Sequence, residues 1–477
     1  MEQSLDTRAA TLTKRFCTHL AATTWQSLSP AARRECRRGV LDWLGCALAG
    51  STHREVDVLL SVYGAAGGRA QATVLGRDLR LGVLEAPVVN GQMGHLLDYD
   101  DTHMGGVVLH ASSPVLAALF ALAERKQVSG AALMLAYAVG FEAGVRVGRT
   151  APDHHDGGWH LTGTLGTIAA GAAASRLLGL DAQQTTYALA IAATQAAGMQ
   201  QNRGTMCKSF HAGKAASNGV LAALLAEKGF DGTQEIVEGG KGFGRIYSRR
   251  ADPDALLADL DGPWMIESNG HKPYACGVLL HPLIDAMVEI RRRCSLDPAE
   301  VSKIELTVHP LVLSITGVSE PSTGLQSKFS FRHSAAVAFI DGNARVAQYT
   351  DAKANDRRIV ALRRTVTARG DASMGKDEAR AVLTAGGERH EVHVPHASGT
   401  TAKPMTDEAI EAKFVANAAP VIGAARAQEV IALVERLDDL ADARVVVNAV
   451  AKSAPARHSA SAPGGPQYLP ADGKDSR

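Results

Sequence analysis

The sequence predicts a mainly α-helical protein, in which a smaller α+β lid domain is inserted into a large all-helical domain. Composition gives the first indication: Gly is abundant, at 47 of 477 residues, while aromatic residues make up only 5%. Such a composition favours close-packed helices over a sandwich of aromatic and β-branched strands. The second indication is a change in the spacing of apolar residues: the helical pattern stops near residue 266 and returns at about 405. We therefore assign 1–265 and 397–450 to the helical domain and 266–396 to the lid.

Helix after helix is predicted in the first half of the chain. Ser29-Pro30 places a capping hydroxyl before a proline whose missing N–H costs nothing in a first turn. Apolar residues then follow at helical spacing and end at Gly50. Ser113-Pro114 is a second capping serine followed by a proline, and Ser129 is predicted to cap a further helix. These signals indicate a helical bundle rather than a βαβ alternation.

Small residues dominate the stretch 162–178, which contains three glycines and a run of alanines. We expect a central helix here, because only small side chains allow neighbouring helices to approach so closely. Two more helices are predicted at about 181–198 and 211–228.

Strand signals gather in the proposed lid. Val301–Val308 alternates with period two, as a half-buried strand does. The stretch 379–394 reads as two strands around the turn Gly386-Gly387, and 334–340 as a buried helix. A capped helix begins near Thr406, helical texture continues to about 440, and 451–477 is predicted to be a disordered tail.

Charge and cysteine content exclude several classes. The formal net charge is +1, which argues against a polybasic nucleic-acid or anionic-membrane binder. Six scattered cysteines form no CxxC pair, so we expect no disulfide framework and no zinc or iron–sulfur site. The N-terminus lacks a signal peptide pattern, and polar residues interrupt the apolar run 107–123. A cytoplasmic protein without a membrane span is expected.

The densest polar cluster is Asp98-Tyr99-Asp100-Asp101-Thr102-His103, with His110 following. Carboxylates crowd together where some accept backbone N–H bonds and others hold a catalytic partner. Two alternatives stay open. The cluster could simply cap helices, or its oxygen atoms could ligate a divalent metal ion.

Three further segments carry candidate groups. His160 precedes the small-residue helix, and its imidazole could act as a general acid or base. Lys208 lies at a probable helix start, and Lys272 precedes a proline where the two domains meet. Each could be an incidental residue when taken alone. A histidine spacing that suggests a metal site occurs at His390, His393 and His396. On a strand, however, the side chains of the first two point to opposite faces. We therefore regard all three as surface residues.

Taken together, these segments resemble the MmgE/PrpD family, which includes 2-methylcitrate dehydratase, cis-aconitate decarboxylase and iminodisuccinate epimerase. The resemblance spans about 10–440. It rests on segments that follow one another in the family's order: 95–103, 159–166, Lys208 with His211-Ala212-Gly213, and Lys272-Pro273-Tyr274, with support from Asn90-Gly91, Lys328-Phe329-Ser330 and Lys413-Phe414.

The resemblance implies an active site between a helical domain and a lid, no cofactor, no obligatory metal and a homodimer. It carries the family's catalytic roles to Asp98, His110, His160 and Lys208. Substrate binding is expected from Thr102 and Lys272, and we add the nearby His103 and His333.

Two departures from the decarboxylase pattern affect the expected reaction. Gly277 stands where the decarboxylase has a histidine, and His333 stands where it has a tyrosine. Both argue against cis-aconitate decarboxylation. We expect a cofactor-independent lyase that dehydrates a 2-methylcitrate-like or related hydroxy di- or tricarboxylic acid. An epimerase, a decarboxylase or a non-catalytic acid-binding relative remain alternatives.

Overall fold

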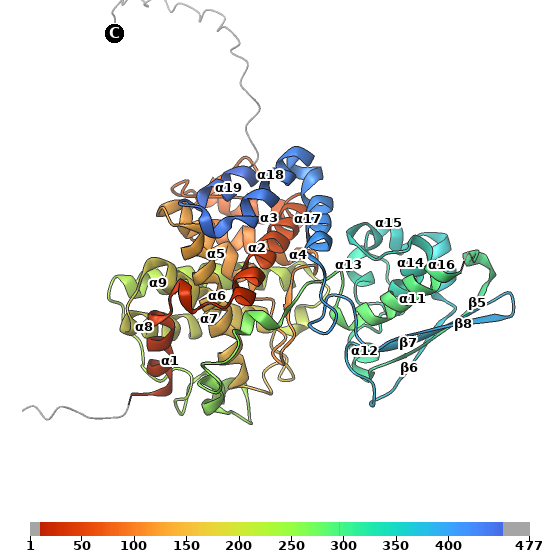
Figure 1. Ribbon diagram of the computed structural model, residues 1–477, viewed down its shortest axis with the longest axis horizontal. Coiled ribbons are helices and arrows are strands. Elements are labelled where there is room, and N and C mark those ends of the chain that lie inside the picture. Colours follow the sequence, from red (N-terminus) through yellow and green to blue (C-terminus); the bar gives the residue numbers. More distant parts are fainter. Residues whose placement is uncertain (1–9, 295, 452–477) are drawn as a thin grey trace, which may run out of the picture.

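The computed structural model describes residues 10–294 and 296–451, and in these two ranges the chain forms a large helical body and a smaller body that contains a sheet (Figure 1). The predicted tail at 452–477 lies outside the described residues. The helical body comprises α1 (Leu12–Ala22), α2 (Pro30–Gly50), α3 (Arg54–Ala66), α4 (Glu85–Leu96), α5 (Ser112–Arg125), α6 (Gly130–Arg149), α7 (Leu161–Leu178), α8 (Ala182–Ala193), α9 (Met206–Glu227), α10 (Phe243–Tyr247), α17 (Asp407–Ile422), α18 (Ala424–Glu435) and α19 (Arg444–Val450). It also holds one short antiparallel pair, β1 (Ala72–Thr73) with β2 (Arg80–Leu81).

The small-residue helix α7 is the centre of the helical body, as predicted. It packs against α5, α6, α8 and α9, and nearly all of its residues are buried. Glycines allow these contacts: a Cβ on Gly219 of α9 would lie 2.6 Å from the carbonyl carbon of Ala170 in α7. A Cβ on Gly213 would lie 2.0 Å from the carbonyl oxygen of Val88 in α4. The backbones of α4, α7 and α9 therefore touch directly.

Helix α6 is long and apolar enough to cross a membrane by length and composition. In the structure, 89% of its most apolar window is buried. It packs against α5 and α7, so it is a core helix of this body.

Several helix starts differ from the sequence-based expectations. Ser29 and Ser129 do cap their helices. Ser113 does not cap α5, because that helix already begins at Ser112, and the Ser113 hydroxyl donates instead to Asp100. Helix α9 begins at Met206, so Lys208 lies within its first turn rather than before it.

The smaller body is a mixed four-stranded sheet with helices packed on it. Its strands are β5 (Val301–Val308), β6 (Val366–Gly370), β7 (Ala379–Ala385) and β8 (Glu388–Val394), in the order β6-β5-β7-β8. The predicted strand and hairpin are confirmed, whereas β6, which pairs parallel to β5, was not predicted. The helices are α11 (His281–Arg293), α12 (Pro310–Ile315), α13 (Gly324–Ser327), α14 (Phe331–Asp341), α15 (Asp351–Ala354) and α16 (Arg357–Arg363).

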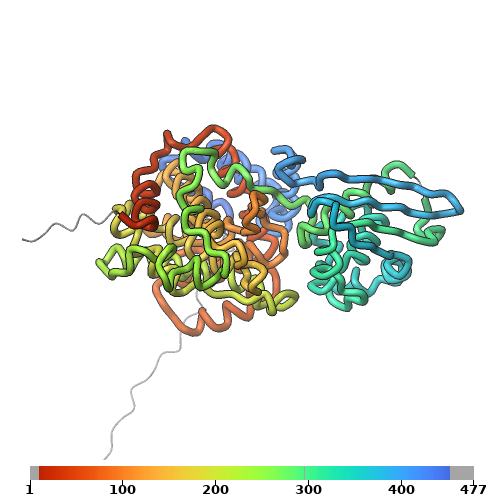
Figure 2. The backbone as a smooth tube through the Cα atoms, turned by 90° about the horizontal axis from the view of Figure 1, so that it is seen from below, coloured from red at the N-terminus to blue at the C-terminus, as the bar shows by residue number. Residues whose placement is uncertain are grey.

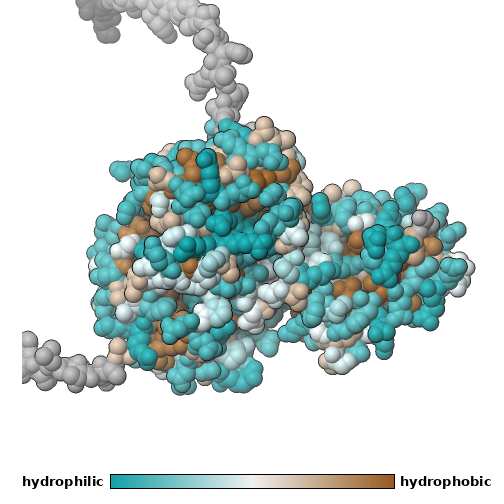
Figure 3. Space-filling view, viewed as in Figure 1, coloured by the Kyte–Doolittle hydropathy of each residue, from teal (hydrophilic) through white to brown (hydrophobic). Residues whose placement is uncertain are grey.

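The two bodies lie side by side, and the smaller one projects from the larger (Figures 2 and 3). Each has its own hydrophobic cluster, but Leu97 and Tyr99 of the helical body belong to the cluster of the smaller body. At the junction β3 (Thr102–His103) pairs with β4 (Asn269–Gly270). Lys328 of the smaller body donates to the carbonyl oxygens of Leu97, at 2.5 Å, and Ala275, at 2.6 Å. The turn that follows α4 thus forms part of the interface between the two bodies.

Candidate active site

Asp98 brings together two lysines from distant segments. Its Oδ1 accepts hydrogen bonds from Lys208 Nζ at 3.0 Å and from Lys272 Nζ at 2.9 Å. Lys272 also donates to the Asp98 carbonyl oxygen at 3.0 Å, and it is 1% exposed. Asp98 has φ 51°, a left-handed conformation that is uncommon outside glycine. The turn after α4 is therefore held in an unfavourable backbone state at the point where the two ammonium groups converge.

The charges at this point do not cancel. Burial by itself would raise the pKa of Asp98, but the two lysine ammonium groups outweigh it and hold that pKa well below its usual range. Asp98 thus faces two lysines, and the buried Lys328 lies close enough to interact with all three groups. The three ammonium groups exceed the two carboxylates of the site, Asp98 and Asp100, by one positive charge. Such an excess suits an anionic ligand.

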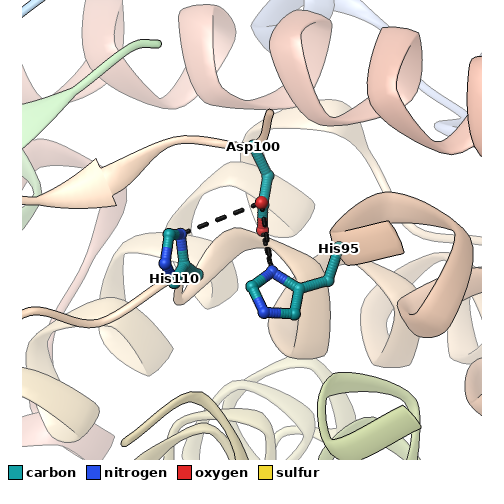
Figure 4. A group of neighbouring side chains, drawn as sticks. All are labelled: His95, Asp100 and His110. Atoms are coloured by element: carbon teal, nitrogen blue, oxygen red, sulfur yellow. Dashed lines mark hydrogen bonds and ion pairs between the residues drawn. The ribbon is translucent and has the colours of Figure 1, made fainter. Parts of the chain in front are cut away.

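A second group, His95, Asp100 and His110, adjoins the first (Figure 4). Asp100 Oδ2 lies 2.8 Å from Nδ1 of His95, and Oδ1 lies 3.8 Å from Nδ1 of His110. His110 Nδ1 also lies 2.8 Å from the carbonyl oxygen of Asp101 and 3.0 Å from the hydroxyl of Thr102. A carbonyl oxygen can only accept, so Nδ1 of His110 carries the hydrogen.

The protonation states of these imidazoles follow from their burial. Burial and the charge of Lys272 lower the pKa of His110 to about 3. Burial likewise lowers the pKa of His95, whose Nδ1 donates to Asp100. Both rings are therefore neutral near pH 7, with the hydrogen on Nδ1 and a lone pair on Nε2. His95 Nε2 is buried without a hydrogen-bond partner among the described residues. Each Nε2 is in the state of a general base.

His160 and His211 extend this row of rings. The His160 ring centroid lies 5.4 Å from that of His95, and its Nδ1 lies 3.0 Å from Nδ1 of His211. Burial lowers the pKa of both rings, that of His211 to about 4. The first turn of α7 is closely packed, since a Cβ on Gly163 would lie 2.3 Å from the carbonyl oxygen of Ala197.

The three carboxylates of the acidic cluster do not converge on a common point. Asp98 faces the lysines, Asp100 faces the histidines, and Asp101 accepts from Asn269 Nδ2 at 2.6 Å and from Ser112. Their arrangement therefore does not match the oxygen-ligated metal site that the sequence left open.

The atoms of His95, Asp100 and His110 that face one another lie within 4.8 Å and could by distance hold a metal ion. Nδ1 of His110, however, donates its hydrogen to the Asp101 carbonyl oxygen, so this nitrogen has no free lone pair for a metal ion. The geometry is that of a hydrogen-bonded His–Asp–His group in which the carboxylate orients two rings.

A buried charged network supports the site from behind. His271 lies between Glu35, at 2.6 Å, and Asp42, at 3.4 Å. Burial would lower the pKa of His271, but these two carboxylates raise it to about 10. Lys413 pairs with Asp42 at 2.6 Å and donates to the carbonyl oxygen of Tyr99 at 2.7 Å. The network fixes the residues that neighbour Lys272 and Asp98 in the chain.

Most of the predicted site residues come together. Asp98, Lys208 and Lys272 are in direct contact, Thr102 contacts His110, and His160 reaches them through His95. His103 and His333 are not brought to this cluster within the described residues. His103 donates from Nδ1 to the Val107 carbonyl at 2.7 Å, and His333 donates from Nε2 to the Gln348 carbonyl at 2.9 Å inside the smaller body. Their expected role in substrate binding stays a prediction.

Four of the groups described here received no individual role from the sequence: His95, Asp100, Lys413 and Lys328. Lys413 is a charged residue among apolar ones, since it lies between buried Ile410 and Phe414 on α17. A charged side chain on the apolar face of a helix must find a buried partner, and this was the available signal.

Comparison with known proteins matches two domains of one family. The chain matches the MmgE/PrpD N-terminal domain over residues 14–256 and the MmgE/PrpD C-terminal domain over 274–439. It is similar to three curated proteins named cis-aconitate decarboxylase. The human protein is 27% identical, with 95% of this chain and 97% of that protein covered, and the mouse protein is 29% identical, with 87% and 88% covered. The Aspergillus terreus protein is 30% identical, with 84% and 88% covered.

Proposed function

The chain belongs to the MmgE/PrpD family, and from this premise we propose that it is a lyase that acts on a small polycarboxylic acid. The observation that supports this most directly is the convergence of Lys208 and Lys272 on Asp98, next to His110 and His95 with bare Nε2 atoms. Excess positive charge suits a di- or tricarboxylate, and an uncharged imidazole suits removal of a proton from carbon.

The proposed chemistry joins these two features. Removing the proton next to a carboxylate builds negative charge on that carboxylate, and fixed cations in a partly dry site stabilise it. Lys208 and Lys272 supply the cations. His110 is our first candidate for the base, because Asp101 and Thr102 hold its Nδ1 and so fix the direction of Nε2. His160 is the second candidate.

Among the reactions of this kind we propose dehydration of a 2-methylcitrate-like hydroxy acid. Dehydration breaks a C–H bond next to a carboxylate and the C–O bond on the adjacent carbon, and forms a C=C bond and water. The neutral, Nδ1-donating state of His95 and His110 provides the base that takes the proton, and an ammonium group of Lys208 or Lys272 protonates the departing hydroxide. Gly277 and His333, where the decarboxylase pattern has a histidine and a tyrosine, support the same reaction.

Decarboxylation of cis-aconitate is the second candidate. The names of the curated relatives favour it, since all three described above are called cis-aconitate decarboxylases.

One experiment separates the two reactions. The purified protein is incubated in deuterated water with 2-methylcitrate, citrate and cis-aconitate, and products are followed by NMR spectroscopy. Dehydration of a hydroxy acid with no release of carbon dioxide from cis-aconitate supports the proposal. Conversion of cis-aconitate to a dicarboxylate establishes decarboxylation instead, and no reaction with any member of the panel contradicts both. Lys208→Gln is the matched inactive control.

A further inference from the structure

A cavity of about 300 Å³ opens between the two bodies, apart from the candidate active site. None of Asp98, Thr102, His110, His160, Lys208 or Lys272 lines it. Its wall comes from five segments of the chain: Tyr99, Pro273 with Tyr274, Arg345, 398–405 and the first turns of α17. The volume falls at the lower end of the range of small-molecule sites.

The polar groups of this cavity are mainly cationic. Arg345 comes from the smaller body and is exposed, and it forms no ion pair with any described residue. Lys403 comes from the segment that leads back to the helical body, and its side chain is 55% exposed. Lys413 contributes a third cation at the base of the cavity.

Carboxylates partner two of these cations, whereas Arg345 has no such partner among the described residues. Asp285 lies 3.5 Å from Lys403, but it also accepts from the Tyr274 hydroxyl at 2.6 Å and the Ser398 N–H at 2.7 Å. Asp42 pairs with Lys413, but the protonated His271 shares it. The Arg345 guanidinium in particular remains without a counter-ion, and its planar donors suit a carboxylate.

The rest of the wall suits a short carbon chain. Pro273, Pro404, Met405, Ala409 and Ala412 present apolar surface between the cations. A ligand that fits this lining carries at least two carboxylates on a compact apolar body.

We propose that this cavity is a second binding site for a small polycarboxylate, separate from the active site. The ligand bridges Arg345 of the smaller body and Lys403 of the segment that returns to the helical body. It lies against Tyr99 and Pro273, the direct chain neighbours of Asp98 and Lys272, so its presence is communicated to the active site through these two residues.

Calorimetric titration with tricarballylate tests the proposal, because this tricarboxylate has no hydroxyl group to lose. We expect two sites on the wild-type protein. The variant Arg345→Gln/Lys403→Gln should bind at the second site about tenfold more weakly, while its turnover changes by less than about twofold. Both side chains are exposed, so the variant should fold, which circular dichroism verifies. The matched control Arg357→Gln/Lys126→Gln removes the same two charges from exposed positions outside the cavity and should bind as the wild type does.

The test separates this proposal from the proposed function. Lys208→Gln should remove only the active-site binding event. If Lys208→Gln leaves the whole isotherm unchanged but Arg345→Gln/Lys403→Gln still weakens binding, the proposed function fails and the second site stands. An isotherm of Arg345→Gln/Lys403→Gln that matches the wild type overturns the second site, whatever the reaction.

Discussion

Asp98 is the residue on which the candidate site depends most, since one of its carboxylate oxygens holds two lysines. Replacing it by Asn leaves both ammonium groups without a counter-ion. We expect Asp98→Asn to lower turnover by at least about 100-fold and the free energy of unfolding by about 3–5 kcal/mol, the typical result of breaking a buried ion pair. Steady-state kinetics and urea unfolding measure the two effects.

Asp156→Asn is the control for that variant, because this carboxylate is 85% exposed. It should behave as the wild type does. Wild-type stability in Asp98→Asn would mean that the lysines are neutralised by some other group.

His110 gives a prediction about pH. Its pKa is lowered to about 3, so its base form persists at all pH values above that and is lost only as the pH falls toward 3. We expect His110→Gln to lower turnover by about 10²–10⁴-fold, and the wild-type kcat/KM to show no ionisation near pH 6.5 from this residue. The pH profiles of wild type and of the exposed-residue control His396→Gln check this. A wild-type profile that falls with a pKa near 6.5 and becomes flat in His110→Gln would contradict it.

At the residue scale, the sequence indicated most site residues because they stand in recognisable segments. It missed the partners that hold them. Asp100 was one of three adjacent carboxylates, and nothing in their spacing tells which one faces His95. Lys328 and Lys413 are isolated lysines whose acceptors, the carbonyl oxygens of Leu97 and Tyr99, are distant in sequence. Such pairings depend on tertiary contacts that local patterns do not encode.

At the scale of elements, the contact of α4 with α9 sets the distance between the turn at Asp98 and Lys208. It depends on Gly213, where a Cβ would lie 2.0 Å from the Val88 carbonyl oxygen. We expect Gly213→Ala to lower the free energy of unfolding by about 1–3 kcal/mol and to lower turnover, because α9 must move away from α4. Thermal unfolding and kinetics are the measurements.

Gly64→Ala on α3 is the matched control for that helix variant. No atom lies within 4 Å of the Cβ it would add, so the substitution should be neutral or slightly stabilising through helix propensity. If the two variants unfold alike, the close approach of α4 and α9 does not limit stability.

The elements themselves were predictable where their patterns were long. The hairpin β7–β8 has regular alternation and a Gly-Gly turn, and the sequence indicated both strands. Strand β6 was not predicted, because its five residues, Val366–Gly370, include only one buried position and so show no alternation. The start of α9 was placed five residues late, since Met206–Phe210 carries no apolar periodicity and its cap, Thr205, resembles an ordinary loop residue.

At the scale of the whole molecule, several buried neutral histidines make stability depend on pH. Burial lowers the pKa of His103 and His333 to about 4 and that of His154 and His281 to about 3. In the unfolded chain these groups titrate near 6.5. Their contribution is therefore fully present above pH 6.5 and is lost as the pH falls toward their folded pKa values.

We expect the melting temperature to fall when the pH is lowered from 7 to 5, with each of these histidines contributing about 1 kcal/mol per pH unit below 6. Asp101 opposes this trend. Its pKa is raised to about 7 by burial, so its protonation on folding favours the folded state at low pH. It is one group against these four histidines and against His110 and His211, whose pKa values burial also lowers. Differential scanning calorimetry at several pH values checks the prediction. A melting temperature that is constant or rises on acidification would refute it.

Leu97 and Tyr99 flank Asp98, yet their side chains belong to the hydrophobic cluster of the smaller body. The lifetime of activity on heating should therefore be set by the smaller body, even though most of the proposed catalytic groups lie in the larger one. Loss of the smaller body's packing removes the support of Asp98 while the helical core is still intact. Limited proteolysis during heating should detect cuts in the segment 296–394 at the same rate as activity disappears, before α7 becomes accessible to the protease.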